Sequence, residues 1–379
     1  MSLVFNRNAL AKGWKRYYLM HKNRRVATIR EDGTCTVYFR SFLPFNLWVE
    51  EGDEMNVRLN NLNNFYYWCA SRVLTLDRKY AKEIMNAIGA SQATTDRDRA
   101  LIAISYHALS LTDVYWIATN NEKTRFEDIS LYQHSLSNSF ADVSLCGKQI
   151  TAQNEELLVN EDAAGDIATN GVAPKAWIRK KDKFYLMKDG DERDVEAELL
   201  ASKILDCFDI EHVAYTADRF DDRKVSKSEI ITSEERSIVA MEYIDIFCAN
   251  HNLDTDAFVL KKDAYAFYMM NIIDYLIGNS DRHWGNWGFF VDNHNNKLLK
   301  LYPLMDFNKA FTNYETTEGG KCQTTRRRLT QKEAAIEAVK KIGLQQTAKV
   351  KRAWFADDAT FAMFEARLNI LKEAAAQEQ

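Results

Sequence analysis

The 379-residue chain uses glycine and proline sparingly, 14 and three in all, yet several of them fall close together. Gly278, Gly285, Gly288 and Pro303 lie within one short stretch. Glycine permits backbone conformations that other residues avoid, and proline ends regular elements. The clustering predicts that the backbone turns sharply here several times, and the rest of the fold has to accommodate those turns.

The same stretch predicts a helix, a loop and a strand pair in succession. Residues 263–277 are mostly apolar, begin with an aspartate that suits an N-cap, and are followed by Gly278, a typical helix stop. Residues 287–291 and 298–302 predict a β-hairpin around the polar turn 292–296. A polar loop is therefore expected between a buried helix and a hairpin.

A hairpin brings its two open ends together, because paired strands lie about 5 Å apart. Asn286 comes just before the first strand, Asp306 just after the second, and Asp281 lies on the loop. Two carboxylates and an amide oxygen are ligands that suit Mg²⁺. Phosphoryl transfer uses such a set: one aspartate takes the acceptor hydroxyl's proton, while an asparagine and a second aspartate hold the metal.

Phosphoryl transfer also needs a lysine for the phosphates and a carboxylate that orients it. Lys188 ends a predicted strand, residues 184–187, and an acidic helix follows it. Glu196 and Glu198 both lie on that helix; the choice between them stays open, with Glu198 favoured.

Two further segments suit nucleotide binding. A further strand is predicted at residues 176–178, and the turn before it contains Gly171, Val172, Ala173 and Lys175. The backbone N–H groups and the lysine of this turn suit a phosphate. An ordinary linker turn is an equal alternative. Glu242-Tyr243 ends a predicted strand, residues 237–243, and suits an adenine-binding hinge.

These motifs together resemble the HipA-like serine/threonine kinases, which include the toxins of bacterial toxin–antitoxin pairs. The run Gly278-Asn279-Ser280-Asp281-Arg282-His283-Trp284-Gly285-Asn286 is similar to their catalytic loop, Pro303-Leu304-Met305-Asp306 to their metal-binding segment, and Gly171-Val172-Ala173-Pro174-Lys175 to their phosphate loop.

The resemblance implies ATP and Mg²⁺ as cofactors and a protein hydroxyl as phosphate acceptor. It implies Asp281 as catalytic base, Asn286 and Asp306 as metal ligands, Lys188 as nucleotide lysine and His283 as a brace of the loop. A helix-turn-helix antitoxin is the partner it suggests.

We therefore expect an α+β protein with a bilobal protein-kinase-like fold and an N-terminal accessory domain. The expected divisions are an accessory domain at 1–150, a strand-rich nucleotide-binding lobe at 151–250 and a helical catalytic lobe at 251–379. Within the first, strands are predicted between residues 17 and 40 and mostly helix over 55–118.

The composition argues against several other classes of protein. The formal net charge of −4 argues against a nucleic-acid-coating protein, and no direct DNA binding is expected. Six scattered cysteines without a C-x-x-C pair favour reduced thiols, and no signal peptide or apolar run of membrane-spanning length is evident. We expect a cytoplasmic bacterial protein. Two stretches are basic: residues 1–50 carry nine Lys/Arg against three Asp/Glu, and 321–352 ten against two.

Two other functions remain open. The run Asp281-Arg282-His283 with Asn286 also resembles phosphoinositide kinases, which favours a lipid phosphotransferase as an alternative. A nucleotide-binding pseudokinase is the other, although the complete set of site residues argues against it. Thr169 is the nearest hydroxyl in the phosphate loop for self-inactivation by phosphorylation.

Overall fold

The computed structural model describes residues 16–74, 81, 95–119, 122–133, 144–145, 174–188, 191–312 and 314–377. These residues form two compact units. The first comprises residues 1–189, 229–237 and 291–297, and the second 190–228, 238–290 and 298–379. Gly171, Val172 and Ala173 of the predicted phosphate loop, and Thr169, lie outside the described residues. The expected division at residues 150 and 250 stays a prediction.

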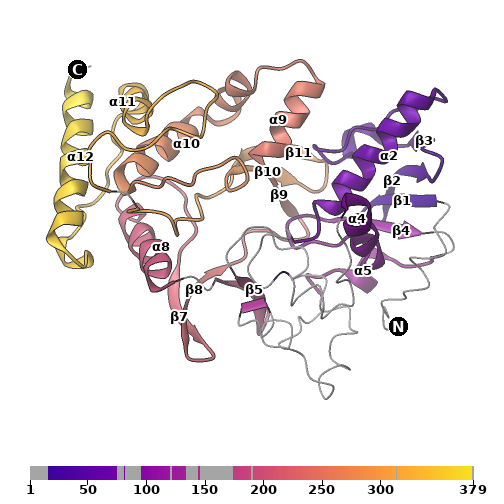
Figure 1. Cartoon of the computed structure of the whole chain (residues 1–379), viewed down its shortest axis with the longest axis horizontal. Helices are drawn as coiled ribbons and strands as arrows, with labels where there is room; N and C mark the ends of the chain where they lie inside the picture. The colour runs from indigo at the N-terminus through magenta and orange to yellow at the C-terminus, as the bar shows by residue number, and fades with distance from the viewer. Residues whose placement is uncertain are drawn as a thin grey trace. The chain divides into compact units, whose positions relative to one another are not determined.

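The first unit contains a four-stranded antiparallel sheet in the order β3-β2-β1-β4 (Figure 1). Its strands are β1 (Arg16–His21), β2 (Arg24–Arg30), β3 (Cys35–Val37) and β4 (Tyr115–Thr119). Side chains of β1 alternate between buried and less buried, as the sequence pattern predicts for a sheet with one covered face.

The prediction of helix up to residue 118 is wrong at its end, because β4 pairs with β1 in register Tyr17↔Thr119 to His21↔Tyr115. All five residues of β4 are buried. A short apolar run that is buried on both faces has no periodicity that separates strand from helix, so the pairing partner decides.

Two helices, α2 (Met55–Ala70) and α4 (Asp96–Ser105), pack against each other in this unit. Thr95 and Asp98 form a reciprocal capping box at the start of α4. The unit also contains the short helices η1 (Arg40–Phe42) and α5 (Phe126–Ile129), and the hairpin of β5 (Lys175–Lys180) and β6 (Lys183–Lys188).

His21 is a buried titratable group in this unit, with Nε2 lacking a hydrogen-bond partner. Its ring lies against the rings of Phe42 and Tyr115, at centroid distances of 5.1 and 5.0 Å. Burial lowers the pKa of His21 to about 4; Asp113 acts in the opposite direction, and nearby Arg24 and Lys22 lower the pKa further. The imidazole is therefore neutral in the folded unit at neutral pH.

The second unit combines a small sheet with a layer of helices. The sheet has the order β11-β10-β9, with β9 (Arg236–Ala240), β10 (Gly288–Asp292) and β11 (Lys297–Leu301), which confirms the predicted hairpin. A second hairpin joins β7 (Thr216–Phe220) and β8 (Arg223–Glu229). Gly288 is required by close packing, because a Cβ there would lie 2.1 Å from the carbonyl oxygen of Val239 in β9.

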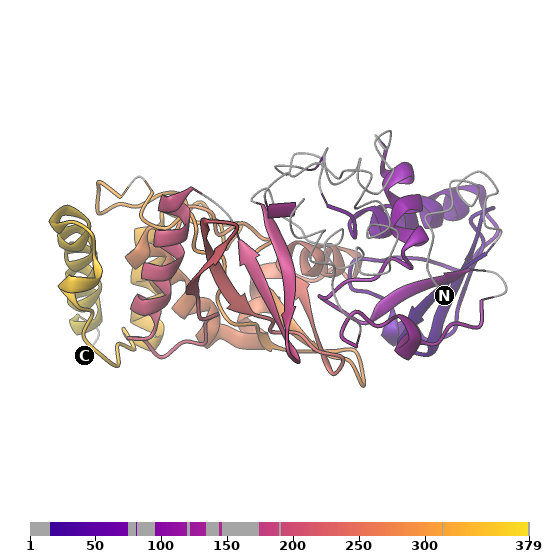
Figure 2. The same cartoon turned by 90° about the horizontal axis from the view of Figure 1, so that it is seen from below.

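The helices of this unit are α8 (Glu192–Leu205), α9 (Met241–Asn250), α10 (Thr255–Ile277), α11 (Gln331–Ile342) and α12 (Asp358–Ala376), with the short η4 (Arg352–Trp354). α11 packs against α10 and α12, and the yellow α12 lies beside α11 in Figure 1; Figure 2 shows α12 from below. No described helix is long and apolar enough to cross a membrane.

The predicted start of a helix at Asp263 is confirmed, although a further helical segment precedes it, so that α10 as a whole begins at Thr255. Asp263 has non-helical backbone angles, φ −158° and ψ 74°, and kinks the helix. Its Oδ1 accepts a hydrogen bond from the Ala266 N–H at 3.1 Å, so it acts as the N-cap of the second half.

Candidate active site

The candidate site begins where α10 ends. Gly278 adopts the left-handed conformation with φ 60° and terminates the helix, as predicted. A Cβ at this position would lie 2.5 Å from the Tyr314 ring, so another residue here would be both strained and crowded. The chain then enters the α10–β10 loop, residues 279–287, which contains Asp281, His283 and Asn286 of the predicted site.

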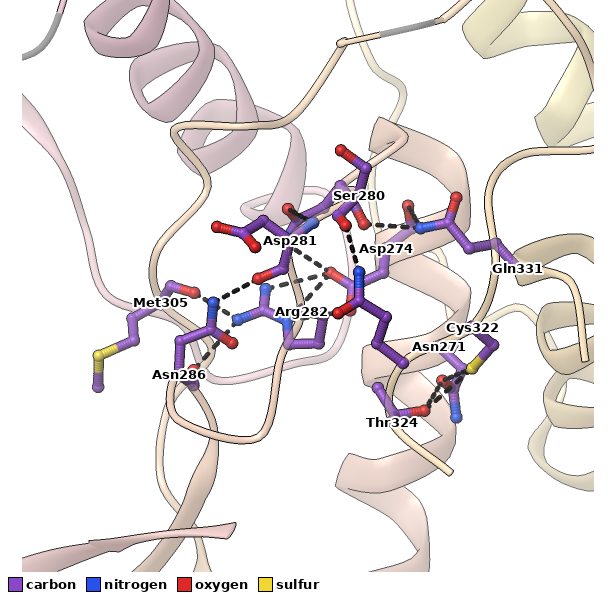
Figure 3. A network of polar contacts seen from close by, with 12 residues as sticks. Asn271, Asp274, Ser280, Asp281, Arg282, Asn286, Met305, Cys322, Thr324 and Gln331 are labelled. Carbon is purple, nitrogen blue, oxygen red and sulfur yellow. Dashed lines mark hydrogen bonds and ion pairs between the residues drawn. The ribbon is translucent and has the colours of Figure 1, made fainter. Parts of the chain in front are cut away.

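A buried arginine, which the sequence analysis gave no role, organises this loop (Figure 3). Arg282 is 2% exposed and pairs with Asp274 of α10 at 3.0 Å. Its Nη1 donates to the carbonyl oxygens of Asn286, at 3.2 Å, and of Met305, the residue before Asp306. One guanidinium therefore joins the helix, the loop and the segment after the hairpin.

A signal for this arginine was present in the sequence. Asp274 interrupts an otherwise apolar helix, and a carboxylate buried in such a helix needs a cationic partner. Arg282 is a cation one residue after the candidate base, in the loop that follows this helix. Only the folded chain identifies which cation is the partner.

Asn286 lies at the start of the hairpin, as predicted, and is 6% exposed. Its Nδ2 donates to the carbonyl oxygen of Asp281 at 2.5 Å, while its Oδ1 is buried and lacks a hydrogen-bond partner. Leaving a buried acceptor unsatisfied costs about 1–3 kcal/mol. A metal ion is one ligand that would satisfy it, since Mg²⁺ prefers oxygen donors.

Asp281 is half-buried and has a carboxylate that accepts no hydrogen bond from any described residue. In Figure 3 this carboxylate points away from the network around Arg282. Burial raises the pKa of Asp281 above its ordinary value; the nearby charge of Asp306 also raises it, whereas His283 and Lys309 lower it. The segment that contains Asp306 is joined to the Asp281 loop by Arg282, whose Nη1 donates to the carbonyl oxygen of Met305.

Asp306 follows the hairpin in a strained backbone conformation, with φ 63°. Its N–H donates to Tyr215 Oη at 3.1 Å, and the Tyr215 ring packs edge-on against Phe307 at 6.1 Å. A left-handed non-glycine residue costs about 1–3 kcal/mol and is typical of functional sites. The fold thus fixes the backbone of Asp306 at the open end of the hairpin.

The predicted trio of Asp281, Asn286 and Asp306 therefore comes together as the hairpin geometry required. Two carboxylates and an orphaned amide oxygen fit a magnesium ion chemically. Among the described residues there is no group of three or more His, Cys, Asp and Glu side chains that suits a metal.

His283 is exposed, and its Nδ1 accepts a hydrogen bond from the Gly285 N–H at 3.0 Å. It thereby closes a tight turn inside the loop. A Cβ on Gly285 would lie 2.9 Å from the His283 ring, which explains the glycine.

The predicted strand at 237–243 ends earlier than expected. β9 stops at Ala240, and Glu242 and Tyr243 lie in the first turn of α9. The Glu242 N–H donates to the Trp284 carbonyl oxygen in the α10–β10 loop at 3.0 Å. This hydrogen bond to the α10–β10 loop replaces continued sheet pairing at Glu242. The role of Glu242 and Tyr243 as an adenine-binding hinge stays a prediction.

The residues predicted to bind the nucleotide phosphates belong to different units. Lys175 and Lys188 are opposite each other in the β5–β6 hairpin of the first unit, and both are buried. Glu198 lies in α8 of the second unit, is 1% exposed and accepts a hydrogen bond from Ser226. Glu196 is paired with Lys224 on the surface. These roles stay predictions.

A second buried arginine fixes the end of α10. Arg367 of α12 is 1% exposed, and its Nη1 and Nη2 donate to the carbonyl oxygens of Tyr275, at 2.6 Å, and Thr316, at 2.7 Å. Its guanidinium lies 4.2 Å from the ring centroid of Tyr314. Burial lowers the pKa of Arg367 below its ordinary value. α12 is thereby tied to the turn that leads into the α10–β10 loop.

The chain was compared with protein-family models, curated proteins and solved structures. No protein-family model matches the chain, and no curated protein matches it. HipA of Shewanella oneidensis, solved with HipB and operator DNA, matches over 96% of this chain and 90% of its own, at 12% identity and a TM-score of 0.50. The proinflammatory kinase CtkA of Helicobacter pylori matches over 54% of this chain and 94% of its own, at 13% identity and a TM-score of 0.41. The likeness to HipA confirms the predicted fold class, and the chain has the α+β fold of a HipA-like kinase.

Proposed function

We propose that this protein is an ATP-dependent serine/threonine kinase of HipA-like type that transfers the γ-phosphoryl group to a protein hydroxyl. One observation carries the proposal. Arg282 joins the backbone of Asn286 to that of Met305, the residue before Asp306, and Asn286 Nδ2 donates to the carbonyl oxygen of Asp281. Among the described residues, the buried Oδ1 of Asn286 has no hydrogen-bond partner. Asp281, Asn286 and Asp306 are the residue set that phosphoryl transfer requires.

Each residue has a role that follows from its surroundings. The Asp281 carboxylate receives no hydrogen bond from the described part of the chain, and would orient the acceptor hydroxyl and take its proton. Asn286 and Asp306 would hold Mg²⁺, which when bound neutralises phosphate charge. Arg282 keeps these two ligands at a fixed separation through the backbone carbonyls of residues 286 and 305.

The nucleotide itself would be bound by residues named from the sequence. Lys188 would contact the phosphates, oriented by Glu198, whose burial in α8 favours it over the surface-paired Glu196. The turn from Gly171 to Lys175 would supply backbone N–H groups, and Glu242-Tyr243 the adenine contacts.

A protein partner belongs to the proposal as well. HipA was solved together with HipB and operator DNA. We propose by analogy that this chain acts as a cytoplasmic bacterial toxin with a helix-turn-helix antitoxin, and that DNA contacts come from the partner. Growth arrest on expression, relieved by co-expression of the neighbouring helix-turn-helix gene, would support this part.

The kinase proposal is tested by incubating purified protein with labelled ATP and Mg²⁺. We expect label on the protein or on a generic protein acceptor, reduced about 10²–10⁴-fold in Asp281→Asn as for loss of a general base. Asp306→Asn should lose Mg²⁺-dependent ATP binding too. Asp53→Asn, a change at an exposed aspartate of the first unit, is the matched control.

Three outcomes would contradict the proposal. Label that appears only on phosphoinositide vesicles would favour the lipid kinase. ATP binding without transfer in the wild-type protein would favour the pseudokinase. Absence of ATP binding would exclude both kinds of kinase.

A further inference from the structure

A basic hairpin follows the metal-binding segment and is not used by the chemistry described above. Lys321 and Thr330 form an antiparallel bridge, and the Cys322 N–H donates to the Leu329 carbonyl oxygen at 2.9 Å. The six residues between these strands, 323–328, read Gln-Thr-Thr-Arg-Arg-Arg. We call residues 323–328 the arginine loop.

The arginine loop is bonded to the α10–β10 loop on both sides of the candidate base. Gln323 Nε2 donates to the carbonyl oxygen of Ser280, the residue before Asp281, at 2.5 Å. Trp284 Nε1, three residues after Asp281, donates to the carbonyl oxygen of Gln323 at 2.7 Å. The start of the arginine loop is therefore fixed beside the reacting group.

Two threonines hold the next part of the loop against α10. Thr324 Oγ1 donates to Asn271 Oδ1 at 2.6 Å, a contact drawn in Figure 3. Thr325 Oγ1 donates to Asp256 Oδ2 at 2.5 Å. The loop backbone is thus ordered without any bound partner, which lowers the entropy cost of binding one.

The three guanidinium groups remain accessible to solvent. Arg326 is paired with Asp245 at 2.7 Å yet its side chain is 63% exposed, and Arg327 is paired with Glu337 at 2.8 Å with 57% exposed. Arg328 is exposed, and no described carboxylate pairs with it. Arg328 is therefore the one cation of the arginine loop whose charge no described carboxylate balances.

We propose that the arginine loop recognises acidic side chains next to the acceptor hydroxyl, so that the enzyme prefers protein acceptors with Asp or Glu near the phosphorylated residue. This inference rests on the proposed kinase function. A protein segment fits the arginine loop better than a nucleic acid does. Arg326 and Arg327 already have carboxylate partners, so Arg328 alone is without one among the described residues. A single arginine suits one or two carboxylates, whereas a nucleic acid presents a run of phosphates.

Direct binding tests the recognition step independently of catalysis. Fluorescein-labelled peptides would carry a central alanine in place of the acceptor, flanked by Glu, Gln or Lys. We expect the Glu peptide to bind wild-type protein about fivefold more tightly than the Gln peptide, as for one exposed ion pair. Arg328→Glu should abolish or reverse this preference. Lys349→Glu makes the same charge change at an exposed lysine outside the arginine loop and should keep it.

Serine versions of the same peptides then connect recognition to transfer. We expect the Glu preference to lie in KM, with kcat for the Gln peptide unchanged in Arg328→Glu. Equal binding of all three peptides, or equal loss in both variants, would overturn the inference. So would a labelled oligonucleotide that binds through Arg328 and is not displaced by the Glu peptide. A Glu peptide that binds through Arg328 but whose serine version is never phosphorylated would support the recognition and refute the kinase.

Discussion

The buried ion pair between Arg282 and Asp274 allows two roles to be distinguished by substitution, its contribution to the free energy of unfolding and its positioning of the candidate metal ligands. The side chains are 2% and 5% exposed, and the closest N–O distance is 3.0 Å. Coulomb's law with an effective dielectric of about 20 gives roughly 5 kcal/mol of attraction at that distance. Removing two ions from water costs several kcal/mol each, so the pair adds little net stability.

Removing one partner is a different case, because the other charge stays buried without compensation. Arg282→Met and Asp274→Leu should each lower the free energy of unfolding by about 3–5 kcal/mol. The double variant should recover most of this loss. About 2 kcal/mol should remain, because the carbonyl oxygens of Asn286 and Met305 lose a buried donor.

Function should not recover in the double variant. Without the guanidinium the direct link between the carbonyl oxygens of Asn286 and Met305 is lost, and a displacement of about 1 Å costs on the order of 10²-fold in rate. Urea unfolding followed by tryptophan fluorescence would give the stabilities. Calorimetric titration with Mg²⁺ and ATP, together with phosphate transfer at saturating nucleotide, would report on the site.

Two results would refute this reasoning. A double variant as unstable as the sum of the single ones would show that the pair is not the reason for the destabilisation. A double variant with wild-type Mg²⁺–ATP affinity and transfer rate would show that Arg282 does not position the ligands.

Three further predictions follow from buried positions. Gly288→Val should destabilise the second unit by about 1–3 kcal/mol, because its Cβ would collide with the Val239 carbonyl; an unchanged melting temperature would contradict this. His21→Phe should reduce the acid sensitivity of the first unit. The pKa of His21 is about 4 in the folded unit and 6.5 in the unfolded chain, so the unfolded chain takes up the proton first as pH falls. Up to about 3 kcal/mol of the free energy of unfolding is lost across that interval. Urea midpoints at both ends of the interval would measure this, and equal shifts in the two proteins would argue against it. Arg367→Met should lower kcat and leave the KM for the nucleotide unchanged. The control Leu371→Ala, at another buried position of α12, should lower only the melting temperature. If the two variants have equal kcat, the role of Arg367 is structural only.

The placement of Asp281, Asn286 and Asp306 at one end of the hairpin was predictable because these three residues are close in sequence. Asp281 and Asn286 share one loop, and Asp306 is brought back to them by a hairpin whose strands and turn are legible in the apolar pattern. Gly278 and the capping role of Asp263 follow from local backbone rules in the same way. Local chemistry fixes such features whatever the rest of the chain does.

Features that depend on distant partners were missed. β4 looks like the end of a helical region until β1 pairs with it. Glu242 looks like the end of a strand until its N–H bonds to the α10–β10 loop and a helix begins. In both cases the apolar pattern by itself does not separate strand from helix, and a hydrogen bond to a distant segment decides the conformation.

The sequence by itself determined the helix, loop and hairpin order, and with it the three polar residues that meet at one end of the hairpin. Only the tertiary structure decided what holds them there. Arg282 is one cation among 50 Lys and Arg in the sequence, and becomes the centre of the site because folding buries it against Asp274 and two backbone carbonyls. The physical reason is burial: a charge removed from water must take its partners from the fold, and the sequence does not show which partners will be within reach.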